Sequence, residues 1–377
     1  MSGLEDCRRA VADAVVAAMG RDGLQWAREW DERWTPMNAV SGRPYRGINR
    51  IALAAAGSIL ATPDGRWCTY SQAEKSGWRI RKGEHASASV EFWSRWCRTR
   101  DGRVVDERRA RELVRDGRED EAILRDARLA PRVSPAFHSG QISGIPAMAT
   151  HSHAGEPAGI VEALVASSRC PVREARSDDA YYSPSADEIV IPQRTQFKTL
   201  DGYVRVLAHE MAHSTARVVG RDTSTYGTDL AARAHEELVA ELGSVFVCSD
   251  LGLSGAAAAD DPGAKTALEQ HAAYLKSWMS ALRDDQDELA RASSEAQRAA
   301  DTIEARLPKG LVPSGTAGRE TDMEGQRELD AERRKEEEAR ERREREERER
   351  AERRRQGERR QAMQRNAARQ RHAQRQR

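Results

Sequence analysis

The segment His209-Glu210-Met211-Ala212-His213 constrains the fold of this chain more than any other feature of the sequence. Residues four apart in an α-helix lie about 40° from each other around the axis, so both imidazoles could reach one metal ion. The glutamate between them lies further round, where its carboxylate could touch a metal-bound water without being a ligand. This is the HExxH arrangement of zinc-dependent peptidases, in which the metal lowers the pKa of water and the glutamate takes its proton. The motif therefore predicts a zinc site with Glu210 as the catalytic base.

The residues around the motif predict a helix with two different sides. An apolar side follows the i, i+3, i+4, i+7 spacing and consists of Val204, Leu207, Met211 and Thr215. Burial of this side would turn His209 and His213 toward a cleft. Asp201 is expected to begin the helix as its N-cap. The alternative is a surface helix that carries two histidines by coincidence.

A catalytic zinc site needs a third protein ligand. The segment 234–248 is apolar nearly all round, which predicts a buried helix, yet Glu237 and Glu241 share one of its faces. Buried carboxylates are costly unless they are paired or bind a metal. We therefore expect Glu237 to be the third ligand and Glu241 to orient a histidine. Spacing alone leaves Glu236 and Glu241 open as ligands, and solvated carboxylates on a partly exposed helix are the alternative to a metal site.

Charge is distributed unevenly along the 377 residues, a length that suits two or three domains. From about Arg319 onward the chain is rich in Glu, Arg and Gln and has almost nothing apolar to bury, which predicts an exposed charged helix or a disordered tail. The last segment, 353–377, holds ten arginines and one glutamate and so carries +9, whereas the whole chain carries +1. The remainder is therefore about −8, and the near-neutral total conceals a basic tail on an acidic body.

The five cysteines are scattered and form no CxxC pair, which argues against a disulfide framework or a cysteine zinc site. The N-terminus lacks the uninterrupted apolar stretch of a signal peptide, and no segment approaches the ~18 apolar residues that span a membrane. These features predict a soluble cytoplasmic protein that does not engage a membrane.

The first ~150 residues differ in character from the rest. An amphipathic opening helix, from Leu4 to about Trp34, carries Trp26, Trp30 and Trp34 at a spacing typical of a core stripe. Two clusters then combine basic, polar and aromatic side chains, and their candidate nucleic-acid-binding residues are Arg43, Tyr45, Arg46, Asn49, Arg50, Arg79, Arg81 and Lys82. Such interleaving suits single-stranded nucleic acid, because cations meet phosphates and rings stack on bases. Structural turns and ordinary surface arginines explain the clusters about as well.

A short β-branched strand is expected at 187–192, just before the HExxH helix. It either lines a cleft edge, where an extended peptide could pair with it, or is a buried interior strand. Candidates for stabilising a transition-state oxyanion are Tyr182, Tyr226, His271 and Tyr274, with core packing as the alternative for each.

Seven sequence blocks together resemble the ArdC-type antirestriction proteins of plasmids and phages. In chain order they are SGRPYRGINR, WCTYSQAEKSGWRIRKGEHASASVEFW, AFHSGQISGIP, YYSPSADEIVIP, HEMAHSTARVVGRD, HEELVAELGSVFVCSDLG and HAAYLKSWMSAL. The resemblance covers most of residues 10–300. It implies an N-terminal domain that binds single-stranded DNA, followed by a zincin-like metallopeptidase domain, in a protein that helps incoming mobile DNA survive restriction. By matching motifs, His209, His213 and Glu237 become metal ligands and Glu210 the base.

The expected organisation is α+β, with a DNA-binding domain at 1–150, a metallopeptidase domain at 155–306 and a charged tail at 307–377. Two places depart from the family pattern. The charged stretch 100–132 looks like an inserted hairpin or helix, and Phe137-His138-Ser139 stands where a more apolar strand is expected.

Three hypotheses follow. The first is a zinc metallopeptidase joined to a single-stranded-DNA-binding domain, acting in antirestriction, with a host protein as a possible peptide substrate. The second is a DNA-binding shield whose zinc site is only structural. The third is a scaffold whose charged tail recruits partners. Glu210 favours the first over the second, because a purely structural site does not need a base.

Overall fold

The computed structural model describes residues 2–22, 35–60, 64–147, 157–253, 278–285 and 287–312. Residues 1–316 form one compact unit. The charged tail from residue 313 on, the three tryptophans at 26, 30 and 34, and the candidates His271 and Tyr274 lie outside the described residues, whereas Leu307 at the expected start of the tail is buried in the core. The expected α+β fold is confirmed, and within the described residues no helix is long and apolar enough to cross a membrane.

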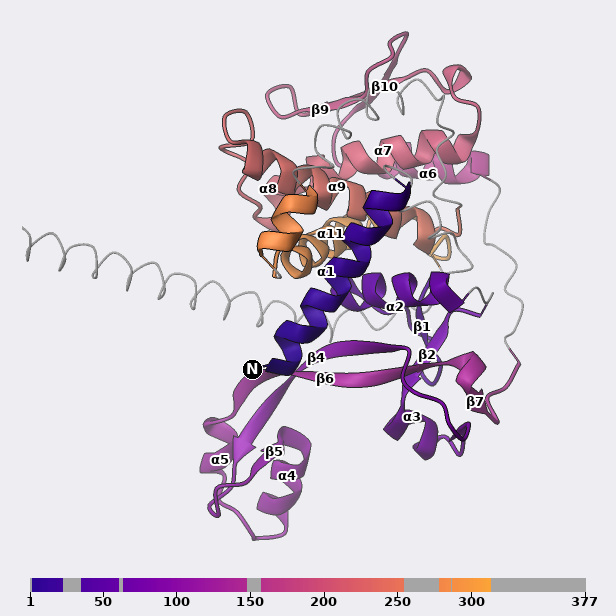
Figure 1. Ribbon diagram of the computed structural model, residues 1–377. Coiled ribbons are helices and arrows are strands. Elements are labelled where there is room, and N and C mark those ends of the chain that lie inside the picture. The colour runs from indigo at the N-terminus through magenta and orange to yellow at the C-terminus, as the bar shows by residue number, and fades with distance from the viewer. Residues whose placement is uncertain are drawn as a thin grey trace, which may run out of the picture. The chain divides into compact units, whose positions relative to one another are not determined.

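A five-stranded sheet organises the N-terminal half (Figure 1), with the strand order β1-β2-β6-β4-β5. Its strands are β1 (Met37–Asn38), β2 (Arg66–Thr69), β4 (Ala88–Arg98), β5 (Val104–Asp106) and β6 (Arg128–His138). The antiparallel pair of β4 and β6 is the longest ladder and runs from Ala88 opposite Ala136 to Trp96 opposite Arg128. A separate two-stranded ladder joins β3 (Arg79–Ile80) to β7 (Ile142–Ser143).

The helices of this half are α1 (Ser2–Asp22), α2 (Gly47–Leu60), α3 (Tyr70–Lys75), α4 (Glu107–Arg115) and α5 (Ala122–Arg125). The charged stretch 100–132 therefore contains β5, which forms a hairpin with the preceding β4, and the helices α4 and α5, and it leads into β6. His138 ends β6 as a buried residue, and its ring packs edge-on against Trp67 with a centroid distance of 4.9 Å. A histidine is accepted in this strand because Trp67 covers its ring and its Nε2 contacts the carbonyl oxygen of Asp64.

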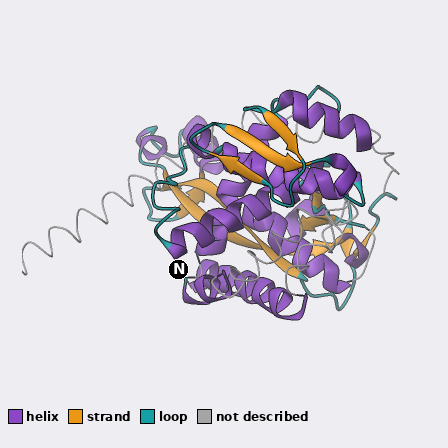
Figure 2. Cartoon of the chain, turned by 90° about the horizontal axis from the view of Figure 1, so that it is seen from above, coloured by secondary structure: helices purple, strands orange, loops and turns teal. Residues whose placement is uncertain are grey.

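The second half consists of helices and a three-stranded sheet (Figure 2). Its helices are α6 (Pro157–Ser167), α7 (Leu200–Ser214), α8 (Ala216–Val219), α9 (Leu230–Asp250) and α11 (Glu288–Glu304), and residues 278–284 are also helical. The sheet has the order β8-β10-β9, with β8 (Val172–Ala175), β9 (Tyr181–Ser183) and β10 (Glu188–Pro192). β10 is thus the interior strand, so the cleft-edge alternative is wrong; β8 and β9 are the edges.

One hydrophobic core joins the two halves. It contains buried side chains of α1 and α2, such as Met19 and Ile51, together with side chains of α6, α7, α9, α11 and β10. The buried Arg50 of α2 also donates to both carboxylate oxygens of Asp250 on α9, at 2.9 and 3.0 Å. Figure 1 shows α1 running alongside the helices of the second half. The N-terminal helices therefore help to bury the helices that carry the HExxH motif and Glu237.

Candidate functional site

Helix α7 carries the HExxH motif and begins as a capped amphipathic helix. Thr199 is its N-cap, because the Thr199 hydroxyl accepts the N–H of Gly202 at 3.1 Å; the expectation that Asp201 caps the helix is wrong. The expected apolar side is buried, with Val204 and Leu207 fully covered. His209 and His213 consequently lie on the other side, with side chains only 12% and 13% exposed.

Three potential ligand atoms converge between α7 and α9. Nε2 of His209 lies 3.2 Å from Nε2 of His213. The carboxylate of Glu237 on α9 lies 3.5 Å from Nε2 of His209 and 3.8 Å from Nε2 of His213. One ligand atom from each residue lies within 4.8 Å of the other two. The structure therefore brings together the three residues that the sequence selected as metal ligands.

The remaining nitrogen of each histidine faces a second carboxylate. Nδ1 of His213 donates to Glu236 at 3.1 Å, and Nδ1 of His209 lies 3.6 Å from Glu241. An imidazole that gives its Nδ1 proton to a carboxylate presents the lone pair of Nε2, and this is the usual way in which proteins orient metal-binding histidines. Two such lone pairs and a carboxylate directed at one point suit a divalent cation. The residues therefore fit the metal ion that the motif predicts.

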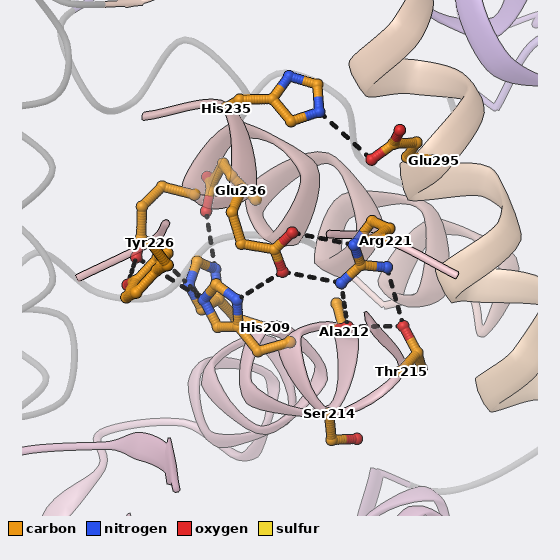
Figure 3. A network of polar contacts seen from close by, with 12 residues as sticks. His209, Ala212, Ser214, Thr215, Arg221, Tyr226, His235, Glu236 and Glu295 are labelled. Carbon is orange, nitrogen blue, oxygen red and sulfur yellow. Dashed lines mark hydrogen bonds and ion pairs between the residues drawn. The ribbon is translucent and has the colours of Figure 1, made fainter. Parts of the chain in front are cut away.

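Two arginines hold these outer carboxylates in place, and Figure 3 shows the contacts of the first, Arg221. The guanidinium of Arg221, which is only 2% exposed, donates to Glu236 at 2.8 and 2.9 Å and to the carbonyl oxygen of Ala212 at 2.8 Å. Arg205 forms an ion pair with Glu241. Burial alone would raise the pKa of Glu236, but the hydrogen bonds from His213 and Arg221 lower it to about 2. Glu236 is therefore a charged anchor for His213 at neutral pH.

The carboxylates also set the charge of His209. Burial disfavours the charged imidazole, but the nearby carboxylates of Glu237 and Glu241 outweigh burial and raise the pKa of His209 to about 10. The cluster thus attracts positive charge strongly, and a metal cation and a proton are competing ways to supply it.

Glu210 and Tyr226 complete the surroundings of the three convergent residues. Glu210 is buried, and among the described residues no hydrogen bond or ion pair engages its carboxylate. The Tyr226 hydroxyl donates to Glu237, which places this oxyanion candidate beside the site. Tyr182 instead donates to Asp187 at 2.8 Å, within an ion pair between Asp187 and Arg169.

Close packing of α7 against α9 brings the ligands together. A Cβ atom added at Gly243 of α9 would lie 3.2 Å from the Cβ of Ala212 on α7 and 3.7 Å from the carbonyl oxygen of Ala296 on α11. Because these contacts leave little room for a side chain, glycine allows α9 to lie against both helices. The separation of Glu237 from the two histidines depends on this contact.

Sequence reasoning left the role of Glu236 open and missed the two arginines that support the site. Glu236 is distinguished from Glu237 by direction, since it faces Nδ1 of His213 rather than the convergence point. Arg205 lies on the HExxH helix four residues before His209, and such a helical position beside a carboxylate-rich helix was a usable signal. Arg221 follows the helix in a loop, where spacing gives no information.

Two family models match this chain. The N-terminal domain of the anti-restriction factor ArdC matches residues 5–126, and a zincin-like metallopeptidase domain matches residues 160–295. An uncharacterized protein, y4eC of Sinorhizobium fredii, is 32% identical over 310 residues, which cover 80% of this chain and 92% of that protein. The crystal structure of the antirestriction protein ArdC from plasmid R388 is 26% identical, with a TM-score of 0.60 and coverage of 80% of this chain and 97% of that one.

The chain belongs to the ArdC-like antirestriction family. This confirms the resemblance that the sequence blocks indicated. A second structure of the R388 protein, with Mn(II) bound, is 28% identical and gives a TM-score of 0.58 over 80% of this chain and 98% of that one. A DNA primase TraC of Escherichia coli is 30% identical over 78% of this chain, but the chain spans only 26% of its length.

The candidate nucleic-acid residues of this ArdC-like chain fall into two groups. Arg43, Arg79, Arg81 and Lys82 are exposed. Asn49 and Arg50 are used inside the molecule. Asn49 binds the backbone of Glu91, with its amide donating to the carbonyl oxygen at 2.6 Å and its own oxygen accepting the N–H at 2.7 Å. Arg50 is only 4% exposed and is paired with Asp250, so we withdraw both from the candidate DNA interface.

Tyr45 and Arg46 are intermediate cases. The Tyr45 ring packs against the small core around Trp67, and burial raises the pKa of Tyr45 to about 12. Arg46 forms an ion pair with Asp301 of α11, although a third of its side chain remains exposed. Both side chains have structural partners, so neither is a free contact for DNA.

Proposed function

We propose that this chain is an antirestriction protein that binds single-stranded DNA and acts as a zinc-dependent metallopeptidase, protecting incoming plasmid or phage DNA from host restriction. The observation that carries the peptidase part is the convergence of His209, His213 and Glu237 beside a buried Glu210. We assign DNA binding to residues 1–150 and peptidase chemistry to residues 155–306. The basic tail, 307–377, would add affinity for nucleic acid that does not depend on sequence.

The metal would be held by His209, His213 and Glu237, with Glu236 and Glu241 fixing the two imidazoles. A bound zinc ion supplies Lewis acidity, lowering the pKa of water and polarising a carbonyl. The Glu210 carboxylate accepts a proton from the attacking water and passes it to the amine that leaves. The open carboxylate of Glu210 suits this role, because a base already engaged in an ion pair would bind a proton poorly.

An extended peptide would reach the site along β9, which is an edge of the three-stranded sheet. Edge strands offer unpaired N–H and C=O groups to a substrate strand. The Tyr226 hydroxyl donates to Glu237. It would be the hydrogen-bond donor that stabilises an oxyanion formed at the site.

The DNA-binding part of the proposal uses Arg43, Arg79, Arg81 and Lys82, which are exposed and can meet phosphates. The family assignment supports it, as does the domain match of residues 5–126. The Mn(II)-bound structure of the R388 relative supports a divalent cation, and zinc is our choice on the donor set of two imidazoles and a carboxylate.

The test compares the wild type with Glu210→Gln in two assays, hydrolysis of a casein substrate and survival of incoming unmodified DNA in a restricting host. We expect Glu210→Gln to keep its metal and its DNA affinity, to lose hydrolysis and to protect DNA poorly. Asp222→Asn, at an exposed carboxylate, is the control. Full protection by Glu210→Gln would favour the alternative function, a DNA shield whose zinc site is structural.

A further inference from the structure

The β4–β6 ladder has one outer face that combines aromatic rings with arginines. Alternate residues of a strand share a face, and residues opposite each other in the register share it too. Phe92 lies opposite Arg132 and Trp96 lies opposite Arg128, and Arg98 follows on the same face. We call the surface made by Phe92, Trp96, Arg98, Arg128 and Arg132 the β4–β6 face.

Helices cover the other side of the ladder and one end of this face. Arg95, which points to the opposite side, pairs with Glu107 of α4 at 3.4 Å, so α4 lies against that side. On the same side of the ladder as the β4–β6 face, Val90 and Ala136 pack with Leu53 of α2. Beyond that end the face opens, and Phe92 is 46% exposed although it is a large apolar residue.

The rings and arginines form a positively charged surface. The guanidinium of Arg132 lies over the Trp96 ring, 3.8 Å from its centroid. Small residues between the two rings, Ser94 and its partner Ala130, leave space for Arg132 to lie along the ladder. Arg98, Arg128 and Arg132 are all exposed.

The strand residues of the face include one carboxylate, Asp106 of β5, which lies opposite Trp96. It accepts the N–H of Arg109 at 2.8 Å as the N-cap of α4 and is therefore committed to the helix. The groups of this face that can contact a ligand are therefore guanidinium cations and aromatic rings.

We infer that the β4–β6 face is a binding platform for single-stranded nucleic acid, with an unpaired base stacked on Phe92, another on the guanidinium of Arg132, and phosphates held by Arg98 and Arg128. Stacking needs bases that are not paired, and arginines need phosphates, so one strand satisfies both. A duplex hides its base faces, and a protein partner would not need three arginines around one exposed ring. This inference rests on the proposed DNA binding and locates it on residues outside the set of candidate nucleic-acid-binding residues that the sequence analysis named.

The experiment measures affinity of the full chain for a fluorescent oligo-dT strand at 0.15 M salt and for a duplex of equal length. Because Phe92 is exposed, Phe92→Ala should fold normally, and we expect roughly ten-fold weaker binding to the single strand. Arg132→Ala should weaken it similarly and should reduce the dependence on salt. The matched controls are Tyr181→Ala, an exposed aromatic on β9, and Arg108→Ala, an exposed arginine on α4, and both should bind as the wild type does.

Photocrosslinking of an iodouracil strand, followed by peptide mapping, gives an independent result. Crosslinks on residues 88–98 or 128–134 are expected. If the wild type binds single strands but Phe92→Ala and Arg132→Ala bind equally well and crosslinks fall elsewhere, the inference is wrong while the proposed DNA binding stands. If the wild type prefers duplex or binds neither form, both the inference and the proposed DNA binding fail.

Discussion

The proposed metal centre and the β4–β6 face use similar residue types in opposite ways. At the proposed metal centre the arginines are buried, and Arg221 and Arg205 hold carboxylates that in turn hold histidines. On the β4–β6 face the arginines are exposed and Arg132 lies on an aromatic ring. A buried arginine fixes geometry because losing its partner costs several kcal/mol, whereas an exposed one stays available to a ligand. Burial, more than residue type, therefore separates supporting from binding arginines in this molecule.

Removal of a candidate metal ligand should have the largest effect on the molecule. We expect His213→Ala to abolish stable metal binding and Glu237→Ala to weaken it strongly, because each removes one of three convergent donors. Glu236→Gln should lower metal affinity by about 10–100-fold, because it weakens the hold on the His213 ring. Metal content of purified variants, measured by mass spectrometry, checks all three.

The ligand assignment can be overturned by one pair of results. If Glu237→Ala kept the metal and Glu241→Ala lost it, Glu241 would be the ligand and Glu237 would take the supporting role beside His209.

Two nearby arginines test the rule on burial directly. Arg50→Ala should lower the free energy of unfolding by about 3–5 kcal/mol, because it leaves the buried carboxylate of Asp250 unpaired. Arg43→Ala, at an exposed site of the same cluster, should change stability by less than about 0.5 kcal/mol. Denaturant unfolding curves measure both, and equal losses would show that exposure does not distinguish them.

Acid should reveal the anchored carboxylate. Glu236 has its pKa lowered from 4.5 to about 2, so its ion pair stabilises the folded state above pH 4.5 and loses this effect as the pH falls toward 2. The contribution is about 3 kcal/mol. Unfolding free energies measured between pH 6 and pH 2.5 should therefore fall more steeply for the wild type than for Glu236→Gln. Parallel curves for the two proteins would contradict the assignment.

The smallest expected effect concerns phosphate contacts. Lys82→Ala should weaken binding to single strands of every sequence and reduce the salt slope by about 1, since an exposed cation releases roughly one counterion. The melting temperature should not change. A variant that bound as tightly as the wild type at all salt concentrations would remove Lys82 from the interface.

Prediction from sequence succeeded where periodicity and chemistry coincide. The apolar side of α7 and the two histidines obey one helical repeat, so burial of Val204 and Leu207 fixes where His209 points. The convergence with Glu237 followed because a carboxylate buried on an apolar helix is too costly to keep unless it is paired or binds a metal. The N-cap was wrong by two residues because Thr199 and Asp201 are both suitable capping residues, and short-range spacing does not choose between them.

Prediction was weaker in the N-terminal half because its contacts are non-local. In the sequence, Arg50 resembles a DNA-binding residue. In the structure its guanidinium donates two hydrogen bonds to the carboxylate of Asp250, which lies 200 positions away in the chain. The pairing of Phe92 with Arg132 on the β4–β6 face could not be predicted for the same reason, since these two residues are 40 positions apart and meet only through strand register.

Asn49 has a consequence for solubility as well as for packing. Strand β5 pairs with β4 only from Trp96 to Arg98, so within the part of the chain that the structure describes the backbone of β4 near Glu91 has no strand neighbour on that side. There, the side-chain amide of Asn49 makes hydrogen bonds with both the backbone N–H and the backbone C=O of Glu91, as a residue of a neighbouring strand would do. Unpaired strand edges invite pairing with other chains. We therefore expect the side-chain amide of Asn49 to reduce edge-to-edge aggregation through β4.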